Sequence, residues 1–437
     1  MTTSLLSYHD EHMRGNLSAA QRVSPSEISD ARQDVLQRDK NGEQGWLRIL
    51  DDRSHLNEVK KTIERFKDIK HWLILGVGGS DLGARALLAA LRLQGSKTKL
   101  YFSGDTTDPE ELVSVMDSVP WKQAGINVIS KSGGTLETMG AFFVACERLE
   151  KAVGVKKAAE RIVCTTDPVD GDLHDLAVHK GYGMLSIPKN IGGRFSVLTS
   201  VGLFPLGLAG ANIGKLVSGA CSLRDEWRTE TGTGHMVDRY AAWHVAHDRA
   251  RRQIHVLMPY AASLSSMASW WRQLWAESLG KGKQRNGQKN YDGPTPIVFI
   301  GPTDQHSQLQ LYQDGPDDKV YTFLTADELR TKMRVPNGVK KLSAISYASG
   351  KTFSGLLTAA ADGTSSALIE AGRPVGNLRL AKINEESLGA LITFFEIATA
   401  VAGALYKINA FDQPGVEASK RRVKELLTNP VVEVHAE

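Results

Sequence analysis

One short polar run in this sequence combines three hydroxyl side chains, two glycines and a lysine. It follows the apolar residues 126–129 and contains Ser130, Lys131, Ser132, Gly133, Gly134 and Thr135. Hydroxyls and backbone N–H groups donate hydrogen bonds to a tetrahedral anion, glycines let the backbone approach it, and a lysine adds positive charge. The alternative is a polar loop in which Thr135 caps a following helix. We favour phosphate because a second turn repeats the design.

The second turn is GVGGSDLG at 76–83, which also follows an apolar run and precedes a helical pattern. Such a turn directs backbone N–H groups and a helix N-terminus at an anion. A dinucleotide site is an alternative, since Gly76 and Gly78 match the first two glycines of its fingerprint. The third glycine position is Asp81, whose carboxylate would face a pyrophosphate, so a single phosphate ranks higher. The residues that we expect to contact the ligand here are Gly79 and Ser80.

A carboxylate in an apolar stretch is the candidate base. Glu277 lies in WAESLGK (275–281), close in sequence to Trp271 and Trp275. Apolar neighbours desolvate a carboxylate and favour its action as a base near neutral pH. Gln273 stands four residues earlier and therefore shares the helical face of Glu277. A solvated surface glutamate is the ordinary alternative, and the tryptophans argue against it.

Three further side chains could assist such a base. His306 follows an apolar run in the loop GPTDQHS, and imidazole titrates near neutral pH. Arg194 follows two glycines at a predicted strand-to-helix turn, and Lys420 precedes two arginines. Residue type alone leaves two ordinary explanations open, a capping histidine for His306 and a solvated basic helix turn for Lys420.

These residues lie on an alternation of strands and helices. Short apolar runs predict one series of strands at 71–76, 98–104, 126–130, 161–166 and 183–188, and a second at 253–260, 295–301, 319–325 and 377–383. Uninterrupted apolar runs are typical of strands covered on both faces, and hence of parallel sheets. Loops that follow neighbouring parallel strands meet at one edge of the sheet, so both polar turns should converge there.

The two series predict an α/β protein built from two sandwich units rather than one wide sheet. We expect an N-terminal helical extension without a strand over 1–65 and a first unit over 66–215. A second unit should cover 216–400, with a C-terminal helical segment over 401–437. A polar helical connector near 216–250 should join the two series.

Composition narrows the classes of partner. The chain has 53 basic and 49 acidic residues, a net charge of +4, and no basic run with interleaved aromatics that would mark a nucleic-acid surface. Three scattered cysteines and an N-terminus without a secretory signal favour the cytoplasm. The apolar run 195–214 contains Pro205 and four glycines, so we expect a buried helix rather than a membrane span. Histidine pairs at 9–12 and 244–247 lack partner ligands, so no metal site is expected.

The run S-x-S-G-x-T after a strand resembles the phosphate-binding loop of sugar isomerase domains. Beyond that loop, the chain resembles the glucose-6-phosphate isomerase family, and the glycine form SGGT is similar to its bacterial branch. The matching segments are GVGGSDLG (76–83), SKSGGTLET (130–138), GGRFSVLTSVGL (192–203), QLWAESLGK (273–281), DQHSQLQLYQDG (304–315) and FDQPGVEASK (411–420). Residues 1–60 match no segment of the family. The resemblance implies two three-layer αβα sandwiches of the sugar isomerase type with mainly parallel sheets.

The resemblance also implies a reaction and roles for its residues. It implies reversible conversion of glucose 6-phosphate to fructose 6-phosphate through ring opening and an enediolate, without a cofactor. In that case Glu277 moves the proton between C2 and C1, Arg194 faces the enediolate oxygens, and His306 and Lys420 help to open the ring. Gln273 becomes a substrate contact.

Family members are homodimers in which the ring-opening histidine comes from the neighbouring subunit, which implies shared sites. Two alternatives stay open at this point. One is a broader isomerase that also accepts mannose 6-phosphate, and the other is a non-catalytic phosphosugar-binding regulator.

Overall fold

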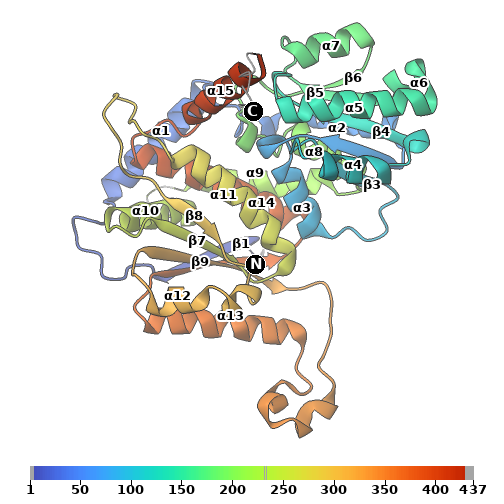
Figure 1. The fold of residues 1–437 in the computed structure, drawn as a ribbon. Helices are drawn as coiled ribbons and strands as arrows, with labels where there is room; N and C mark the ends of the chain where they lie inside the picture. Colours follow the sequence, from blue (N-terminus) through green and yellow to red (C-terminus); the bar gives the residue numbers. More distant parts are fainter. Residues whose placement is uncertain (1–3, 231, 233, 429–437) are drawn as a thin grey trace, which may run out of the picture.

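The computed structural model describes residues 4–230, 232 and 234–428 and arranges them around two five-stranded sheets (Figure 1). Helices pack on both faces of each sheet, which gives two three-layer αβα sandwiches. The predicted fold class is therefore confirmed.

The first sheet is parallel throughout, with the order β3-β2-β4-β5-β6. Its strands are β2 (His71–Leu75), β3 (Lys99–Ser103), β4 (Ala124–Ile129), β5 (Ile162–Thr166) and β6 (Gly183–Ser186). Trp72 and Ile74 point to one face, and Leu73 and Leu75 to the other, as the two-residue period of a strand requires. The first face packs on α2 (Arg53–Arg65), α3 (Leu82–Leu91) and α8 (Ser200–Leu208). The second packs on α4 (Pro109–Ser118), α5 (Leu136–Val153) and α7 (Asp172–Lys180), with the short α6 (Val155–Ala159) after α5.

The second sheet has the order β1-β10-β9-β7-β8 and is parallel except for its edge strand β1. Its strands are β1 (Leu6–His12), β7 (Ile254–Pro259), β8 (Thr295–Val298), β9 (Lys319–Glu328) and β10 (Val375–Lys382). Val256 and Phe323 point to α12 (Leu309–Asp314) and α13 (Phe353–Glu370), and Leu257 and Leu324 point to the centre of the molecule.

The helices at the centre of the molecule join the two sheets. They are α1 (Pro25–Lys40), α9 (Ile213–Thr229), α10 (Met236–Arg249), α11 (Ser265–Leu279) and α14 (Glu385–Leu405). The connector near 216–250 is helical and joins the two series as expected, but it is not a polar surface segment, because α9 and α10 pack against α14 as core helices. Gly219 permits this approach, since a Cβ there would lie 1.9 Å from the Glu386 carbonyl oxygen.

Two apolar segments raise the question of a membrane. Among the described residues, α14 alone is long and apolar enough to span one, and 94% of its most apolar stretch is buried by the rest of the protein. The run 195–214 contributes the buried helix α8, as predicted. Both segments therefore belong to the hydrophobic core.

The expectation that residues 1–65 contain no strand is wrong. β1 pairs with β10 at the edge of the second sheet, with Leu6 and Tyr8 turned into the core. Only these two apolar residues alternate before the strand becomes polar. An alternation of two residues is too short to predict a strand from the sequence. α1 and α2 are helical as expected.

The core is continuous between the two units. A single hydrophobic cluster includes Ile74 of the first sheet and Leu378 of the second. The boundaries predicted at 215/216 and 400/401 lie inside α9 and α14. The division at those positions therefore stays a prediction.

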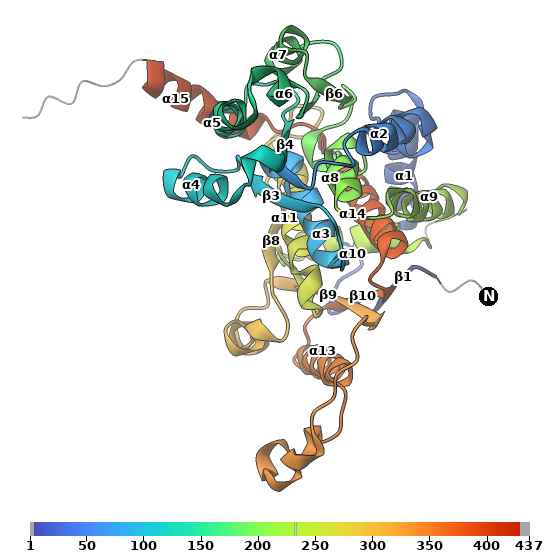
Figure 2. The same ribbon diagram turned by 90° about the vertical axis from the view of Figure 1, so that its right-hand side faces the viewer.

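Two segments extend from the body of the molecule. Residues 329–352 leave β9 and return to α13 through η7 (Asn337–Lys341) and η8 (Ser343–Ala348), and they project from the second sheet (Figures 1 and 2). We call residues 329–352 the arm. At the other end of the chain, α15 (Glu417–Thr428) lies on the surface with every residue exposed.

Candidate active site

The two polar turns lie side by side at the carboxyl edge of the first sheet. The 76–83 turn follows β2 and the 130–135 turn follows β4, and these strands pair directly. The convergence predicted from the sequence is therefore confirmed. Both turns precede helices, α3 and α5, and the first N–H groups of a helix have no partner within the helix and can bind an anion.

The 130–135 turn is held by its own hydroxyls. Ser130 Oγ accepts a hydrogen bond from the Gly133 N–H at 3.1 Å and lies 3.3 Å from Thr135 Oγ1. Ser132 Oγ accepts from the Gly134 N–H at 3.2 Å. Thr135 occupies the N-cap position of α5, but its side chain makes no capping bond. Its hydroxyl therefore remains able to donate to a ligand.

Lys131 is placed differently from the hydroxyls. Its Nζ donates to the carbonyl oxygens of Lys189 at 2.7 Å and Ile191 at 3.1 Å. Burial lowers the pKa of Lys131, and the neighbouring carboxylate of Asp167 opposes that shift. In this arrangement the lysine ties the loop to the 189–191 segment and contributes positive charge to the loop from there.

The 76–83 turn touches the segment that carries Arg194. A Cβ on Gly79 would lie 2.2 Å from the Gly193 carbonyl carbon, so only glycine permits this contact between η2 (Gly78–Ser80) and η4 (Gly193–Phe195). Gly78 has a φ of +59° and lies against the Gln273 amide. The glycines of this turn thus bring β2, Arg194 and α11 together.

Glu277 and Arg194 form the centre of the candidate site. Arg194 Nη1 donates to Glu277 Oε2 at 3.3 Å, with the arginine side chain 2% and the glutamate side chain 35% exposed. Burial lowers the pKa of Arg194, and the charges of Glu277 and Asp412 oppose that shift. A partly exposed carboxylate held by a buried cation suits a base that meets a substrate from solvent.

Gln273 lies on the same face of α11, as predicted. Its Nε2 lies 3.4 Å from Glu277 Oε1, and its Oε1 is buried without a hydrogen-bond partner among the described residues. A buried acceptor without a partner is costly. A substrate hydroxyl would satisfy it.

Trp271 and Trp275 do not provide the apolar cover expected for Glu277. The rings of Trp271 and Trp275 stack with their centroids 6.0 Å apart, and both side chains are buried in the core. There Trp275 Nε1 donates to His255 Nδ1 at 3.0 Å. The reason is helical geometry, because positions two and six residues away lie on other faces of α11. The neighbours of the carboxylate are instead Arg194 and Gln273.

Residues 410–413 form a part of the site that residue types alone did not indicate. Arg194 Nη2 donates to the carbonyl oxygens of Ala410 at 2.7 Å and Asp412 at 2.9 Å, and Nη1 donates to Gln413 Oε1 at 3.0 Å. Arg194 Nε donates to Ser278 Oγ at 2.7 Å. The contacts with 410–413 join positions more than 200 apart in the chain, and the only sequence signal was the segment FDQPGVEASK.

His306 and Lys420 are not brought to Glu277 within one chain. His306 ends η6 (Thr303–His306) with its side chain exposed, and Lys420 is 66% exposed on α15, where it pairs with Glu417 at 2.9 Å. In the described ranges, neither forms a hydrogen bond or ion pair with Glu277, Arg194 or Gln273. Their predicted roles stay predictions.

Asp81 is buried behind the first turn. It forms an ion pair with Arg85 at 2.6 Å, and burial raises the pKa of Asp81 to about 6 despite this partner. The carboxylate is therefore paired with Arg85 within α3 and its N-cap. Throughout the part of the chain that is described, no group of three or more possible metal ligands occurs.

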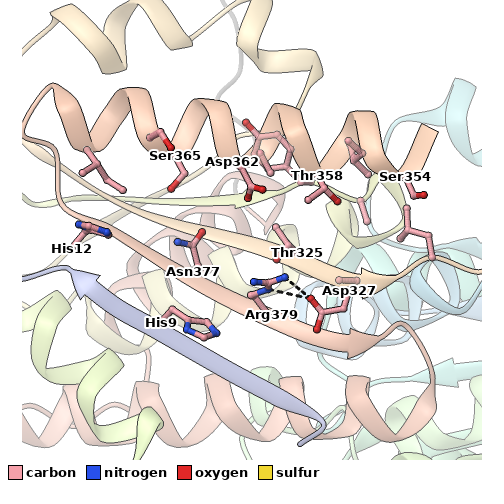
Figure 3. A pocket seen from close by; sticks show the side chains of 18 of the residues that line it. His9, His12, Thr325, Asp327, Ser354, Thr358, Asp362, Ser365, Asn377 and Arg379 are labelled. Atoms are coloured by element: carbon pink, nitrogen blue, oxygen red, sulfur yellow. Dashed lines mark hydrogen bonds and ion pairs between the residues drawn. The ribbon is translucent and has the colours of Figure 1, made fainter. Parts of the chain in front are cut away.

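A cavity of about 590 Å³ lies apart from this cluster, between α13 and the outer face of the second sheet (Figure 3). Its lining includes His9 and His12 of β1 and the ion pair of Arg379 with Asp327 at 2.6 Å. The histidine pair noted in the sequence thus lines a cavity that no predicted site residue reaches.

Comparisons with known proteins point to one family. The family model described as phosphoglucose isomerase matches residues 53–435. The chain is 39% identical to the glucose-6-phosphate isomerase of Rubrobacter xylanophilus over 86% of this chain and 87% of that protein. It is 37% identical to that of Carboxydothermus hydrogenoformans over 85% and 82% of the two chains. The crystal structure of a hypothetical protein from Thermus thermophilus superposes with a TM-score of 0.88 at 33% identity, covering 97% and 99% of the two chains.

Proposed function

The chain belongs to the phosphoglucose isomerase family and interconverts glucose 6-phosphate and fructose 6-phosphate, and we propose that Glu277 is the base of this reaction. The resemblance drawn from the sequence motifs is thus confirmed. The observation that carries the assignment of the base is its carboxylate, 35% exposed and held by the buried Arg194.

The proton transfer follows from this arrangement. In the open-chain aldose, the carboxylate of Glu277 removes the proton from C2, and electrons move toward the C1 oxygen to give an enediolate. Arg194 supplies a fixed cation beside the base, where developing negative charge is stabilised most. The proton of the C2 hydroxyl passes to the C1 oxygen, and return of the abstracted proton from Glu277 to C1 leaves a carbonyl at C2, which gives the ketose. Gln273 Oε1 accepts a hydrogen bond from a substrate hydroxyl.

We assign the phosphate to the turns at the carboxyl edge of the first sheet. Ser130, Ser132 and Thr135 present hydroxyls at the N-terminus of α5, where the helix dipole favours a negative charge. Lys131 adds positive charge, and Gly79 and Ser80 close the site from the neighbouring turn. Anchoring the phosphate away from C1 and C2 orients the reacting carbons toward Glu277.

Ring opening requires groups that one chain does not bring to Glu277. We assign it to Lys420 and to His306 of the partner subunit, so that a homodimer contains two shared sites. The exposed position of His306 on η6, beside α12, supports this assignment.

The arm supports a homodimer. Its sequence carries six lysines and arginines and no acidic residue, and it exposes Met333, Leu342, Ile345 and Tyr347, the last by 73%. Hydrogen bonds within its own hairpin, such as Val335 N–H to the Lys351 carbonyl at 2.9 Å, hold it in shape. Large apolar side chains on a projecting segment mark a surface that binds another protein. The arm lies on the same unit as His306, which favours a second copy as its partner.

The remaining expectations follow from this role. An isomerase of this kind acts in glycolysis and gluconeogenesis, and we place it in the cytoplasm on that ground. A non-catalytic regulator is not favoured, since the relatives are named isomerases. The chemistry is a proton transfer between neighbouring carbons, for which Glu277 and Arg194 supply the groups.

The test uses Glu277→Gln, which keeps the size of the side chain and removes the base. Formation of fructose 6-phosphate from glucose 6-phosphate should fall by about 10³-fold or more, since a general base contributes about 10²–10⁴-fold. Proton exchange at C2, followed by NMR in deuterated water, should disappear with it. Glu147→Gln, on the exposed face of α5, is the matched control. Wild-type exchange in Glu277→Gln would place the base elsewhere.

A further inference from the structure

Lys281 is a buried cation beside the site that no step above uses. It lies four residues after Glu277, just beyond the end of α11, and its side chain is 7% exposed. Its Nζ donates to the carbonyl oxygen of Glu277 and, at 2.6 Å, to that of Asp412. The Asp412 carboxylate oxygen Oδ1 lies 3.6 Å from Lys281 Nζ. Lys281 therefore joins the helix that carries the base to residues 410–413.

Two buried cations meet at one carbonyl group. The Asp412 carbonyl oxygen accepts from Lys281 Nζ and, at 2.9 Å, from Arg194 Nη2. The pKa of Lys281 is lowered to about 8. Burial is the largest cause and the positive charge of Arg194 the second, while the carboxylates of Asp412 and Glu277 oppose the shift. Because the folded-state value lies below the usual 10.5, the charged lysine lowers stability at neutral pH. Its hydrogen bonds to the carbonyl oxygens of Glu277 and Asp412 offset a part of this cost.

We propose that Lys281 is a positioning residue of the isomerisation site, which ties residues 410–413 to α11 so that Arg194 holds the Glu277 carboxylate. The proposal rests on the proposed role of Glu277. Arg194 divides its donors between Glu277, Ser278 and the 410–413 segment. If that segment moves away from α11, the guanidinium follows it and leaves the carboxylate.

The protonation state of Lys281 should then appear in catalysis. The charged groups that face it are Arg194 of η4, Glu277 of α11 and Asp412 of the 410–413 segment. Below pH 8 the ammonium has three donors and attracts both carboxylates, and above pH 8 it loses one donor and the attraction. We expect kcat to fall on the alkaline side as Lys281 loses its proton.

The test compares Lys281→Met with wild type and with Lys283→Met, an exposed lysine two residues later. In Lys281→Met, kcat should fall by about 10- to 100-fold, as expected for a displaced catalytic group. KM should change little. The melting temperature at pH 7 should not fall, because a buried charge is removed, and Lys283→Met should behave as wild type. If Lys281→Met folds poorly, Lys281→Gln replaces it.

The pH profile separates positioning from a merely structural role. The alkaline fall of kcat near pH 8 should be absent from the residual activity of Lys281→Met and from Lys281→Arg, whose guanidinium keeps its charge. A wild-type kcat in Lys281→Met, or the same alkaline fall in either variant, would overturn the proposal. If Glu277→Gln stayed active, the proposed function itself would fail, whatever Lys281 shows.

Discussion

The two halves of the candidate site differ in how completely one chain builds them. The half proposed to move the proton is assembled within one chain, because Arg194 contacts Glu277, Ser278 and residues 410–413 from a buried position. The half proposed to open the ring is not, because His306 and Lys420 are exposed and contact neither Glu277 nor Arg194 in the described ranges. We infer that the base is positioned by the fold of a single subunit and the ring-opening groups by assembly.

The largest expected difference concerns the substrate form. His306→Ala should slow conversion of glucose 6-phosphate by about 10²-fold, the usual contribution of one acid–base group. An aldose phosphate too short to close into a ring should be affected far less, because only the ring-opening half is damaged. Product formation is measured on both substrates, with Glu277→Gln as the variant that should lose both. An equal loss on both substrates in His306→Ala would remove the distinction between the halves.

A smaller effect is expected at the two turns to which we assign the phosphate, because both proposed halves would depend on them equally. Thr135→Ala removes one hydroxyl that donates to a charged group, worth about 1.5–3 kcal/mol. KM for the phosphorylated sugar should therefore rise about 10-fold or more, with kcat changed less. Inhibition by inorganic phosphate should weaken in parallel. Thr98→Ala, before β3 and at the opposite edge of the sheet, is the control, and unchanged phosphate inhibition in Thr135→Ala would refute the assignment.

The smallest expected effect is on stability, and it compares the buried carboxylate of Asp81 with the exposed carboxylate of Glu417. The pKa of Asp81 is raised from 3.8 to about 6, so its contribution to stability is present below about pH 4 and is lost as the pH rises through 6. The melting temperature of wild type minus that of Asp81→Asn should therefore be higher at pH 4, where Asp81 is neutral, than at pH 7, where the buried carboxylate is charged. Glu417→Gln, at an exposed carboxylate on α15, is the control. Equal differences at both pH values for Asp81→Asn would show that its burial does not control its ionisation.

The sequence predicted the parts of the site that depend on local pattern. Apolar runs located β2 and β4, and parallel pairing required the loops after them to converge. The four-residue spacing placed Gln273 beside Glu277. In each case a short stretch of chain contains the whole signal.

The parts that were missed depend on contacts that are distant in the chain or weak in pattern. Nothing near Arg194 in the sequence indicates that its guanidinium holds residues 410–413, since that contact forms only when α11 and the chain after α14 pack together. Trp271 and Trp275 suggested an apolar cover for Glu277 because composition does not specify which helical face meets the core. β1 was missed because only Leu6 and Tyr8 alternate.

Mixing two inactive variants tests the central claim most directly. Glu277→Gln and His306→Ala chains are unfolded and reassembled together, which places an intact Glu277 beside an intact His306 of the partner subunit in one site of each mixed dimer. About half of randomly paired dimers are mixed and each has one intact site, so roughly a quarter of wild-type activity should return under two-fold symmetry. If each site were built from one chain, every site would keep a lesion. No recovery, in a sample where mixed dimers are shown to have formed, would contradict the shared site.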